Sequence, residues 1–324
     1  MRKIKWGILS TARIAVEKII PAIQKSSNGE VYAIASSSGK AETLAEKLHI
    51  PVSYNHYEEL LADPNIDAVY IPLPNSMHAE WTIKAANAKK HVLCEKPAGL
   101  DPYEVEEMLG ACKRNGVHFM EAFMYRFHPQ HEKAKEIINS GTIGDIKMMR
   151  AFFSFYMDDR AGNIRLDSQL GGGALYDIGC YCINSLRYIL DEEPIQMKLL
   201  GELNKEGVDT TAAVVLEFPS NIHASFMCSF DATFKDEYEI IGTKGSIRVP
   251  HAYRPDLNAG NGMVQLFQEN EMKQYILHGD QYLLEVEHFA DCVITNREPV
   301  YTGENTLNNI KVINTLLSEA NKRM

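Results

Sequence analysis

The stretch HVLCEKPAGL, His91 to Leu100, decides the fold of this chain. Its apolar run is short and ends abruptly in charged residues, which predicts a buried strand of a parallel sheet. Lys96 therefore falls at the carboxyl end of that strand, the edge at which open α/β sheets bind ligands. Pro97 favours an extended backbone at Lys96, which helps to aim the ammonium group over this edge. From composition alone, a surface lysine is the simpler interpretation.

A strand at Ile4 to Leu9 turns into a helix at the place where a dinucleotide-binding fold holds its pyrophosphate. The usual motif there is G-x-G-x-x-G, and this chain has Ser10, Ala12 and Ala15 at the three glycine positions. Alanine is the next smallest residue, so the close approach of backbone to phosphate is partly preserved. An arbitrary strand-turn-helix remains the alternative. The cofactor contacts expected in this loop are Ser10, Thr11, Ala12, Arg13 and Ile14.

The second strand, Val31 to Ser36, indicates which cofactor is bound. An acidic residue at its end would hydrogen-bond the adenosine 2'-hydroxyl of NAD and repel a 2'-phosphate. This chain has no acidic residue there, and serine hydroxyls and a lysine offer donors and positive charge instead. We therefore expect NADP, with NAD as the alternative; the lysine is equally compatible with a solvated helix start. The expected contacts are Ser36, Ser37, Ser38 and Lys40.

The hydrophobic pattern divides the chain into two domains. Strands and helices alternate as far as Ala122, which predicts about six parallel strands in a doubly wound Rossmann domain, residues 1–122. Beyond it, successive strands are joined by short turns such as Gly242 to Gly245, which predicts a large, mostly antiparallel sheet. The expected fold class is thus α/β, with a Rossmann domain followed by an α+β domain, residues 123–324, for substrate binding and dimerisation.

Composition excludes several classes of function. The 33 basic and 43 acidic residues give a net charge of -10, which would repel nucleic acid. No apolar run approaches the ~18 residues that a membrane span needs, and no signal-peptide core follows Met1, so we expect a soluble, cytoplasmic protein. The six cysteines lack C-x-x-C pairs, which favours reduced thiols over disulfides or zinc. The eleven histidines lack H-E-x-x-H or other ligand spacing, so no metal is expected.

Further candidate catalytic residues lie in GGGALYDIGCYCINSLRYIL, a glycine-rich segment followed by an amphipathic helix. Asp177 and Tyr181 are four residues apart and therefore share one helix face. Hydride transfer between an alcohol carbon and a nicotinamide also moves the hydroxyl proton, so it needs a general acid/base. A tyrosine can serve if a nearby cation such as Lys96 favours its phenolate. The alternative for Tyr181 is an amphipathic core tyrosine.

Several of these segments together resemble the glucose-fructose oxidoreductase and inositol dehydrogenase (Gfo/Idh/MocA) family of NAD(P)-dependent oxidoreductases. They are Glu95-Lys96-Pro97 after the fifth strand, FMEAFMYRFHP at Phe119 to Pro129, GGALYDIGCYC at Gly172 to Cys182, and GVDTTAAVVLEFP at Gly207 to Pro219. The similarity covers nearly the whole chain. In motifs it is closest to dimeric dihydrodiol dehydrogenase and to aldose (xylose) dehydrogenases.

The resemblance implies catalytic roles for Lys96, Asp177 and Tyr181, with tyrosine as in sugar-oxidising members rather than histidine as in inositol dehydrogenases. It also implies a proline-asparagine turn beside the nicotinamide, with a histidine three residues later. Pro74, Asn75 and His78 match that pattern. The cofactor contacts implied by the resemblance are Pro72, Leu73, Asn75, His78, Glu95, Lys96 and Pro97.

The expected function is an NADP-dependent oxidoreductase acting on a cyclic vicinal diol or an aldose, working as a homodimer. Tyr125, Arg126, Asp177 and Tyr181 are the expected substrate contacts, whereas Arg160 and Arg165 fit surface arginines better. The alternative function is a non-catalytic NAD(P)-binding sugar sensor or regulator of the same fold. The presence of both Lys96 and Tyr181 favours catalysis.

Overall fold

The computed structural model describes residues 2–321, which group into two compact units. The first contains residues 1–124 and Tyr282–Leu307, and the second contains Tyr125–Gln281 and residues 308–324. The segment Tyr282–Leu307 thus belongs to the first unit, although along the chain it lies between the two parts of the second. The predicted division into a Rossmann domain, residues 1–122, and a domain for substrate binding and dimerisation, residues 123–324, stays a prediction.

The first unit is built on a six-stranded parallel sheet in the order β3-β2-β1-β4-β5-β6. The order reverses between β1 and β4, which is the topological switch point of a doubly wound fold. The strands are β1 (Ile4–Leu9), β2 (Gly29–Ala35), β3 (Val52–Tyr54), β4 (Ala68–Ile71), β5 (His91–Cys94) and β6 (Phe119–Glu121). As expected for a central strand, all four residues of β4 are buried.

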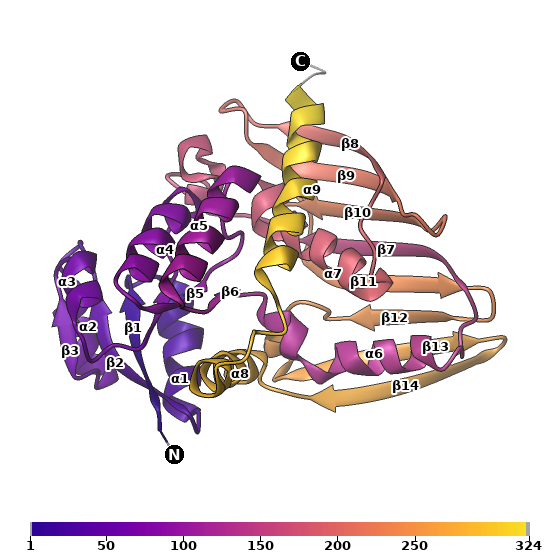
Figure 1. Ribbon diagram of the computed structural model, residues 1–324. Helices are drawn as coiled ribbons and strands as arrows, with labels where there is room; N and C mark the ends of the chain where they lie inside the picture. The colour runs from indigo at the N-terminus through magenta and orange to yellow at the C-terminus, as the bar shows by residue number, and fades with distance from the viewer. Residues whose placement is uncertain (1, 322–324) are drawn as a thin grey trace. The chain divides into compact units, whose positions relative to one another are not determined.

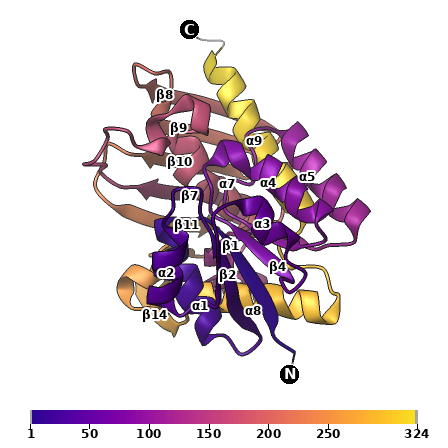
Figure 2. The ribbon, with the colours of Figure 1, turned by 90° about the vertical axis from the view of Figure 1, so that its left-hand side faces the viewer.

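Helices cover both faces of this sheet. They are α1 (Ile20–Lys25), α2 (Ala41–Leu48), α3 (Tyr57–Ala62), α4 (His78–Asn87), α5 (Pro102–Asn115) and α8 (Gln281–Thr295). Figure 2 shows α4 and α5 on one side of the strands and α1 and α8 on the other. Val69 and Ile71 join the core under α4 and α5, whereas Tyr70 points to the opposite face. Trp6 of β1 packs there against Phe289 of α8, with ring centroids 5.6 Å apart.

The second unit is built on an eight-stranded sheet in the order β14-β13-β12-β11-β7-β10-β9-β8. Every neighbouring pair is antiparallel except β7 and β10. The strands are β7 (Ile146–Ser154), β8 (Gln196–Leu203), β9 (Asp209–Glu217), β10 (His223–Ser229), β11 (Lys235–Gly242), β12 (Ser246–Pro250), β13 (Asn261–Gln268) and β14 (Glu271–His278). The Rossmann sheet and the mostly antiparallel sheet confirm the predicted fold class.

One face of this sheet carries α6 (Pro129–Asn139) and α7 (Cys180–Leu190), and the C-terminal helix α9 (Gly303–Asn321) contacts α7 through a hydrogen bond from Asn309 to the Cys180 carbonyl (Figure 1). The strands alternate accordingly: Val214 and Phe226 are buried, whereas Val215 and Met227 are 57% and 48% exposed. The face opposite the helices therefore presents apolar side chains.

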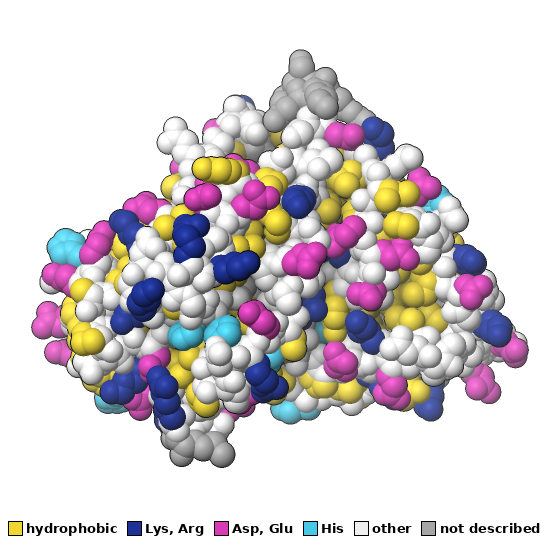
Figure 3. Space-filling model, in the orientation of Figure 1, with side chains coloured by type: hydrophobic (Ala, Val, Ile, Leu, Met, Phe, Trp, Pro, Cys, Tyr) yellow, Lys and Arg dark blue, Asp and Glu magenta, His cyan; other side chains and the backbone are white. Residues whose placement is uncertain are grey.

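No helix among residues 2–321 is long and apolar enough to cross a membrane. Figure 3 shows acidic and basic side chains interspersed over the visible face, without a large region of one sign. All six cysteines are buried free thiols, in agreement with the reduced thiols that the lack of C-x-x-C pairs favoured.

Candidate active site

Lys96 follows β5 directly, at the carboxyl edge of the first sheet. The preceding Glu95 is anchored because it accepts a hydrogen bond from the hydroxyl of Tyr70, which is fully buried in the neighbouring strand β4. The Lys96 amide also donates to this carboxylate, at 3.3 Å. Two adjacent strands thus fix the backbone from which the lysine side chain projects.

His78 holds two loops together at this edge. Its ring is fully buried, with Nδ1 2.8 Å from the Pro97 carbonyl and Nε2 2.8 Å from the Leu73 carbonyl. Burial lowers the pKa of His78 to about 4, so the ring is neutral at physiological pH and donates to one carbonyl at a time. Both ring nitrogens face backbone carbonyls, so His78 links the loops that bear Leu73 and Pro97. The expected cofactor contact of His78 stays a prediction.

The first loop shows how a serine replaces the usual glycine. Ser10 has φ of 138°, a conformation that L-residues rarely adopt. Its hydroxyl accepts from the Ala12 amide at 3.1 Å and donates to the Pro72 carbonyl at 3.2 Å, so local hydrogen bonds support the strained turn. A π-helical turn, η1 (Ala15–Ile19), follows and leads into α1. Such turns are frequent at functional sites.

The end of β2 carries no acidic side chain. Ser36 is buried and its hydroxyl meets that of Ser38 at 2.9 Å, whereas Ser37, Ser38 and Lys40 are exposed. In the first loop, Arg13 pairs with Glu17 at 2.8 Å in a solvent-exposed ion pair of small energetic value. The adenosine end of a cofactor at this edge would therefore meet hydroxyl groups and cations.

In the second unit, glycines at residues 171–173 precede the helix that carries Asp177 and Tyr181, which we call the site helix. These glycines let other segments approach the start of the site helix. A side chain at Gly172 would lie 2.6 Å from the Arg165 carbonyl oxygen, and one at Gly173 (φ +133°) would overlap the Asp209 carboxylate. Asp209 is 5% exposed and accepts from the Leu175 amide at 2.7 Å, and also from the Ala174 amide. It therefore caps the π-helical turn η6 (Leu175–Gly179), which continues into α7.

Asp177 lies on that turn, and Tyr181 follows in the first turn of α7. The Asp177 carboxylate is 16% exposed and accepts from Nε of Arg165 at 2.6 Å. Arg165 was expected at the surface; its side chain is partly exposed, at 43%, but is joined to a candidate catalytic residue. Tyr181 is 5% exposed, and its ring contacts those of Phe153 and Tyr253.

Tyr125 and Arg126, the other two expected substrate contacts, occupy different environments. Tyr125 is fully buried, its hydroxyl hydrogen-bonds Asn184, and its ring centroid lies 5.9 Å from that of Tyr181. Its hydroxyl is thus engaged within the fold, and the ring supports Tyr181. The Arg126 guanidinium stacks over the Tyr188 ring, 3.7 Å from its centroid.

Asp209 and Glu285 of α8 were not singled out from the sequence, and the pairing of Arg165 with Asp177 was not predicted from it. Glu285 is fully buried beneath the first sheet, and neither of its carboxyl oxygens has a hydrogen-bond partner among the described residues. Burial and the nearby Glu95 charge raise its pKa well above the usual range. The contacts of Asp209 and Arg165 and the burial of Glu285 all depend on tertiary packing, so no local sequence pattern indicates them.

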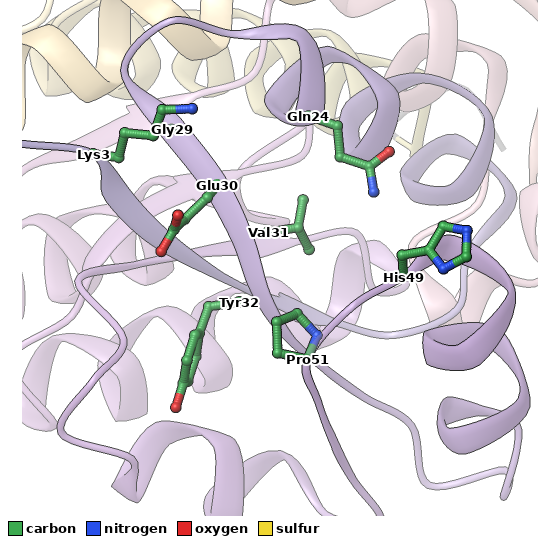
Figure 4. Close-up of a pocket in the computed structure, with 8 residues that line it drawn as sticks. All are labelled: Lys3, Gln24, Gly29, Glu30, Val31, Tyr32, His49 and Pro51. Atoms are coloured by element: carbon green, nitrogen blue, oxygen red, sulfur yellow. The ribbon is translucent and has the colours of Figure 1, made fainter.

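A shallow pocket of about 240 Å³ lies elsewhere, at the amino-terminal end of β2 (Figure 4). Glu30 and Tyr32 of that strand line it, together with Lys3, Gln24 and His49. Because β1 and β2 are parallel, this is the sheet edge opposite the loops that bear Ser10 and Lys96. The pocket therefore takes no part in the candidate site.

Comparison with known proteins identifies the family. Residues 4–123 match the model of the oxidoreductase family with an NAD-binding Rossmann fold, and residues 131–248 match the GFO/IDH/MocA C-terminal domain. The chain belongs to the GFO/IDH/MocA oxidoreductase family. It is therefore an NAD(P)-dependent oxidoreductase, of a family whose similar members are dehydrogenases that act on CH–OH groups.

Two named relatives illustrate the range of proteins to which the chain is similar. A D-xylose 1-dehydrogenase (NADP(+)) of Haloferax volcanii is 37% identical over 316 residues, covering 97% of both chains. A trans-1,2-dihydrobenzene-1,2-diol dehydrogenase of Mus musculus is 33% identical over 297 residues, covering 90% of this chain and 88% of the relative.

Two solved structures of similar proteins agree with the fold. A 3-ketoreductase from Actinomadura kijaniata, in complex with NADP and TDP-benzene, superposes with a TM-score of 0.92 at 28% identity over 98% of each chain. An aldose-aldose oxidoreductase from Caulobacter crescentus, complexed with glycerol, also gives 0.92, at 26% identity over 100% of this chain and 99% of that one.

Proposed function

We propose that this GFO/IDH/MocA member transfers a hydride between NADP and a cyclic vicinal diol or an aldose such as xylose or glucose. The observation that carries the proposal is the 37% identity, over 97% of the chain, with a D-xylose 1-dehydrogenase (NADP(+)). The relative named for a dihydrobenzene diol supports the wider class of substrates. Both named substrates are cyclic molecules with adjacent hydroxyl groups.

Lys96, Asp177 and Tyr181 are proposed to act on one substrate. The Tyr181 phenol takes the proton of the reacting hydroxyl during oxidation and returns it during reduction, as a general acid/base. The Lys96 ammonium favours the phenolate form and hydrogen-bonds the substrate or the nicotinamide ribose. The Asp177 carboxylate orients the substrate by accepting from a neighbouring hydroxyl. The bound nicotinamide supplies the hydride acceptor or donor.

The cofactor proposed is NADP. The residues of the first unit fit a dinucleotide: the Ser10–Ala12 turn has only small side chains at the start of a helix, at the carboxyl edge of a parallel sheet. Exposed Ser37, Ser38 and Lys40 provide donors for a 2'-phosphate. Titration of the intrinsic fluorescence with NADPH and NADH tests this preference, and tighter binding of NADH would contradict it.

We also propose a homodimer formed through the open face of the second sheet. Apolar residues of three strands, Leu200, Val215 and Met227, are between 48% and 68% exposed on this sheet. An exposed apolar face of this kind needs a partner, and a second copy of the same chain is the simplest one.

The alternative is a non-catalytic NAD(P)-binding sensor that keeps the family fold. A spectrophotometric screen separates the two possibilities, with NADP+ and NAD+ each offered a panel of aldoses, polyols and trans-dihydrodiols. The proposal predicts NADP+-dependent absorbance at 340 nm with at least one sugar or diol. Binding of a sugar without reduction of either cofactor would favour the sensor.

A further inference from the structure

We propose that Arg165 is a positioning residue of the active site, which orients the Asp177 carboxylate and places the second unit's own positive charge beside the Tyr181 phenol. This inference rests on the proposed function, since it concerns how the proton-transferring tyrosine is tuned. The family resemblance that suggested Lys96, Asp177 and Tyr181 gave no role to this arginine.

The ion pair is the first observation. Nε of Arg165 lies 2.6 Å from Oδ2 of Asp177, and the carboxylate is only 16% exposed. The Asp177 charge, its hydrogen bond to Arg165 and the charge of the ionised Tyr181 phenolate favour the charged form of Arg165 and raise its pKa. Since such interactions are mutual, the guanidinium acts on both candidate catalytic groups.

The backbone around Arg165 is built to hold it there. Its carbonyl accepts from the Gly173 amide at 2.9 Å, and its amide donates to the Asn163 side chain at 3.1 Å. The absence of a side chain at Gly172 permits this approach, because a Cβ there would lie 2.6 Å from the Arg165 carbonyl oxygen. The glycine-rich segment therefore joins the arginine segment to the start of the site helix.

The pairing of Arg165 with Asp177 changes the charge near Tyr181 and so affects the ionisation of its phenol. An unpaired carboxylate one helical turn from the phenol would disfavour phenolate, whereas a guanidinium beside both favours it. Tyr125 and Tyr253 are in ring contact with Tyr181, and burial raises the pKa of each, so both are neutral. Arg165 thus offsets the negative charge of Asp177 within the second unit.

The test compares Arg165→Met and Arg165→Lys with the matched control Arg160→Met. Arg160 lies in the same segment and pairs with Asp231 rather than with a site residue. We expect Arg165→Met to lower kcat at pH 7 about tenfold and to shift the pH profile of oxidation upward by about one unit. Arg165→Lys should recover part of both effects, and the affinity for NADPH should change less than twofold. An unchanged profile in Arg165→Met, or an equal shift in Arg160→Met, would overturn the proposal.

A second readout needs no turnover and so separates this inference from the proposed function. The absorbance of tyrosine phenolate near 295 nm is measured against pH in wild type and in Arg165→Met, each with and without Tyr181→Phe. The difference within each pair isolates the ionisation of the Tyr181 phenol. It should ionise at lower pH with Arg165 present than in Arg165→Met. Equal midpoints would refute the electrostatic role, even if the sugar screen succeeded. Should Arg165→Met not fold, Arg165→Gln replaces it in both experiments, with circular dichroism verifying the fold.

Discussion

The burial of Asp209 at the start of the site helix predicts how the stability of the protein depends on pH. Its carboxyl is 5% exposed, and burial raises its pKa from 3.8 to about 6 despite hydrogen bonds from backbone amides. A folded-state pKa above the unfolded value means that the folded protein retains this proton longer. The contribution to stability is therefore present below pH 4 and lost as the pH rises through 6.

The rise of about two pH units, at about 1.4 kcal/mol each, corresponds to about 3 kcal/mol. In a unit of this size, 1 kcal/mol shifts the melting temperature by about 2–4 °C. The side chain introduced by Asp209→Asn does not titrate. The difference in melting temperature, wild type minus variant, should therefore fall by about 6–12 °C between pH 4 and pH 8. The loss of one capping bond adds an offset that does not depend on pH.

Far-UV circular dichroism is the suitable assay, because both tryptophans, Trp6 and Trp81, belong to the first unit and would not report on the second. Asp158→Asn, an exposed acidic residue of the second unit, is the control and should show no such trend. A difference that stays constant, or grows with pH, would refute the reasoning. It would mean that the amide groups at the helix start stabilise the carboxylate more than burial destabilises it.

Three further predictions concern the rest of the molecule. Glu285→Gln should raise the melting temperature more at pH 8 than at pH 5, because burial raises the Glu285 pKa and its ionisation opposes folding; an equal effect at both pH values would contradict this. Lys96→Met should weaken both NADPH binding and turnover and move the pH optimum of residual oxidation upward, and unchanged fluorescence titration and rates would exclude its proposed role. Light scattering at micromolar concentration should give about twice the 36.5 kDa of one chain, and a monomer mass would count against the sheet-mediated dimer.

The sequence predicted the architecture well because its strongest signals are local. Apolar runs of strand length, separated by helical periods, predicted six parallel strands, and short turns predicted the second sheet. The placement of Lys96 after β5 follows from the same pattern. The return of Tyr282–Leu307 to the first unit left no such signal, because an amphipathic helix can cover either sheet.

The site was predicted less completely, for the same reason. The four-residue spacing of Asp177 and Tyr181 is local and could be read directly. The contacts of Arg165 with Asp177 and of Asp209 with the helix start join residues 12 and 34 positions apart, so they depend on tertiary packing. His78 shows that residue type alone does not predict a side chain's environment. A histidine in water titrates near neutral pH, but the His78 ring is buried between two backbone carbonyl groups.

The central claim is that Tyr181 transfers the substrate proton, and single-turnover hydride transfer by Tyr181→Phe tests it most directly. Phenylalanine keeps the ring contacts with Phe153 and Tyr253 but lacks the hydroxyl. With the best substrate from the screen and saturating NADP+, we predict a rate lower by roughly two to four orders of magnitude, with NADPH affinity near that of wild type. A variant that retains more than about a tenth of the wild-type rate would contradict the account, because that loss is too small for a missing general acid/base.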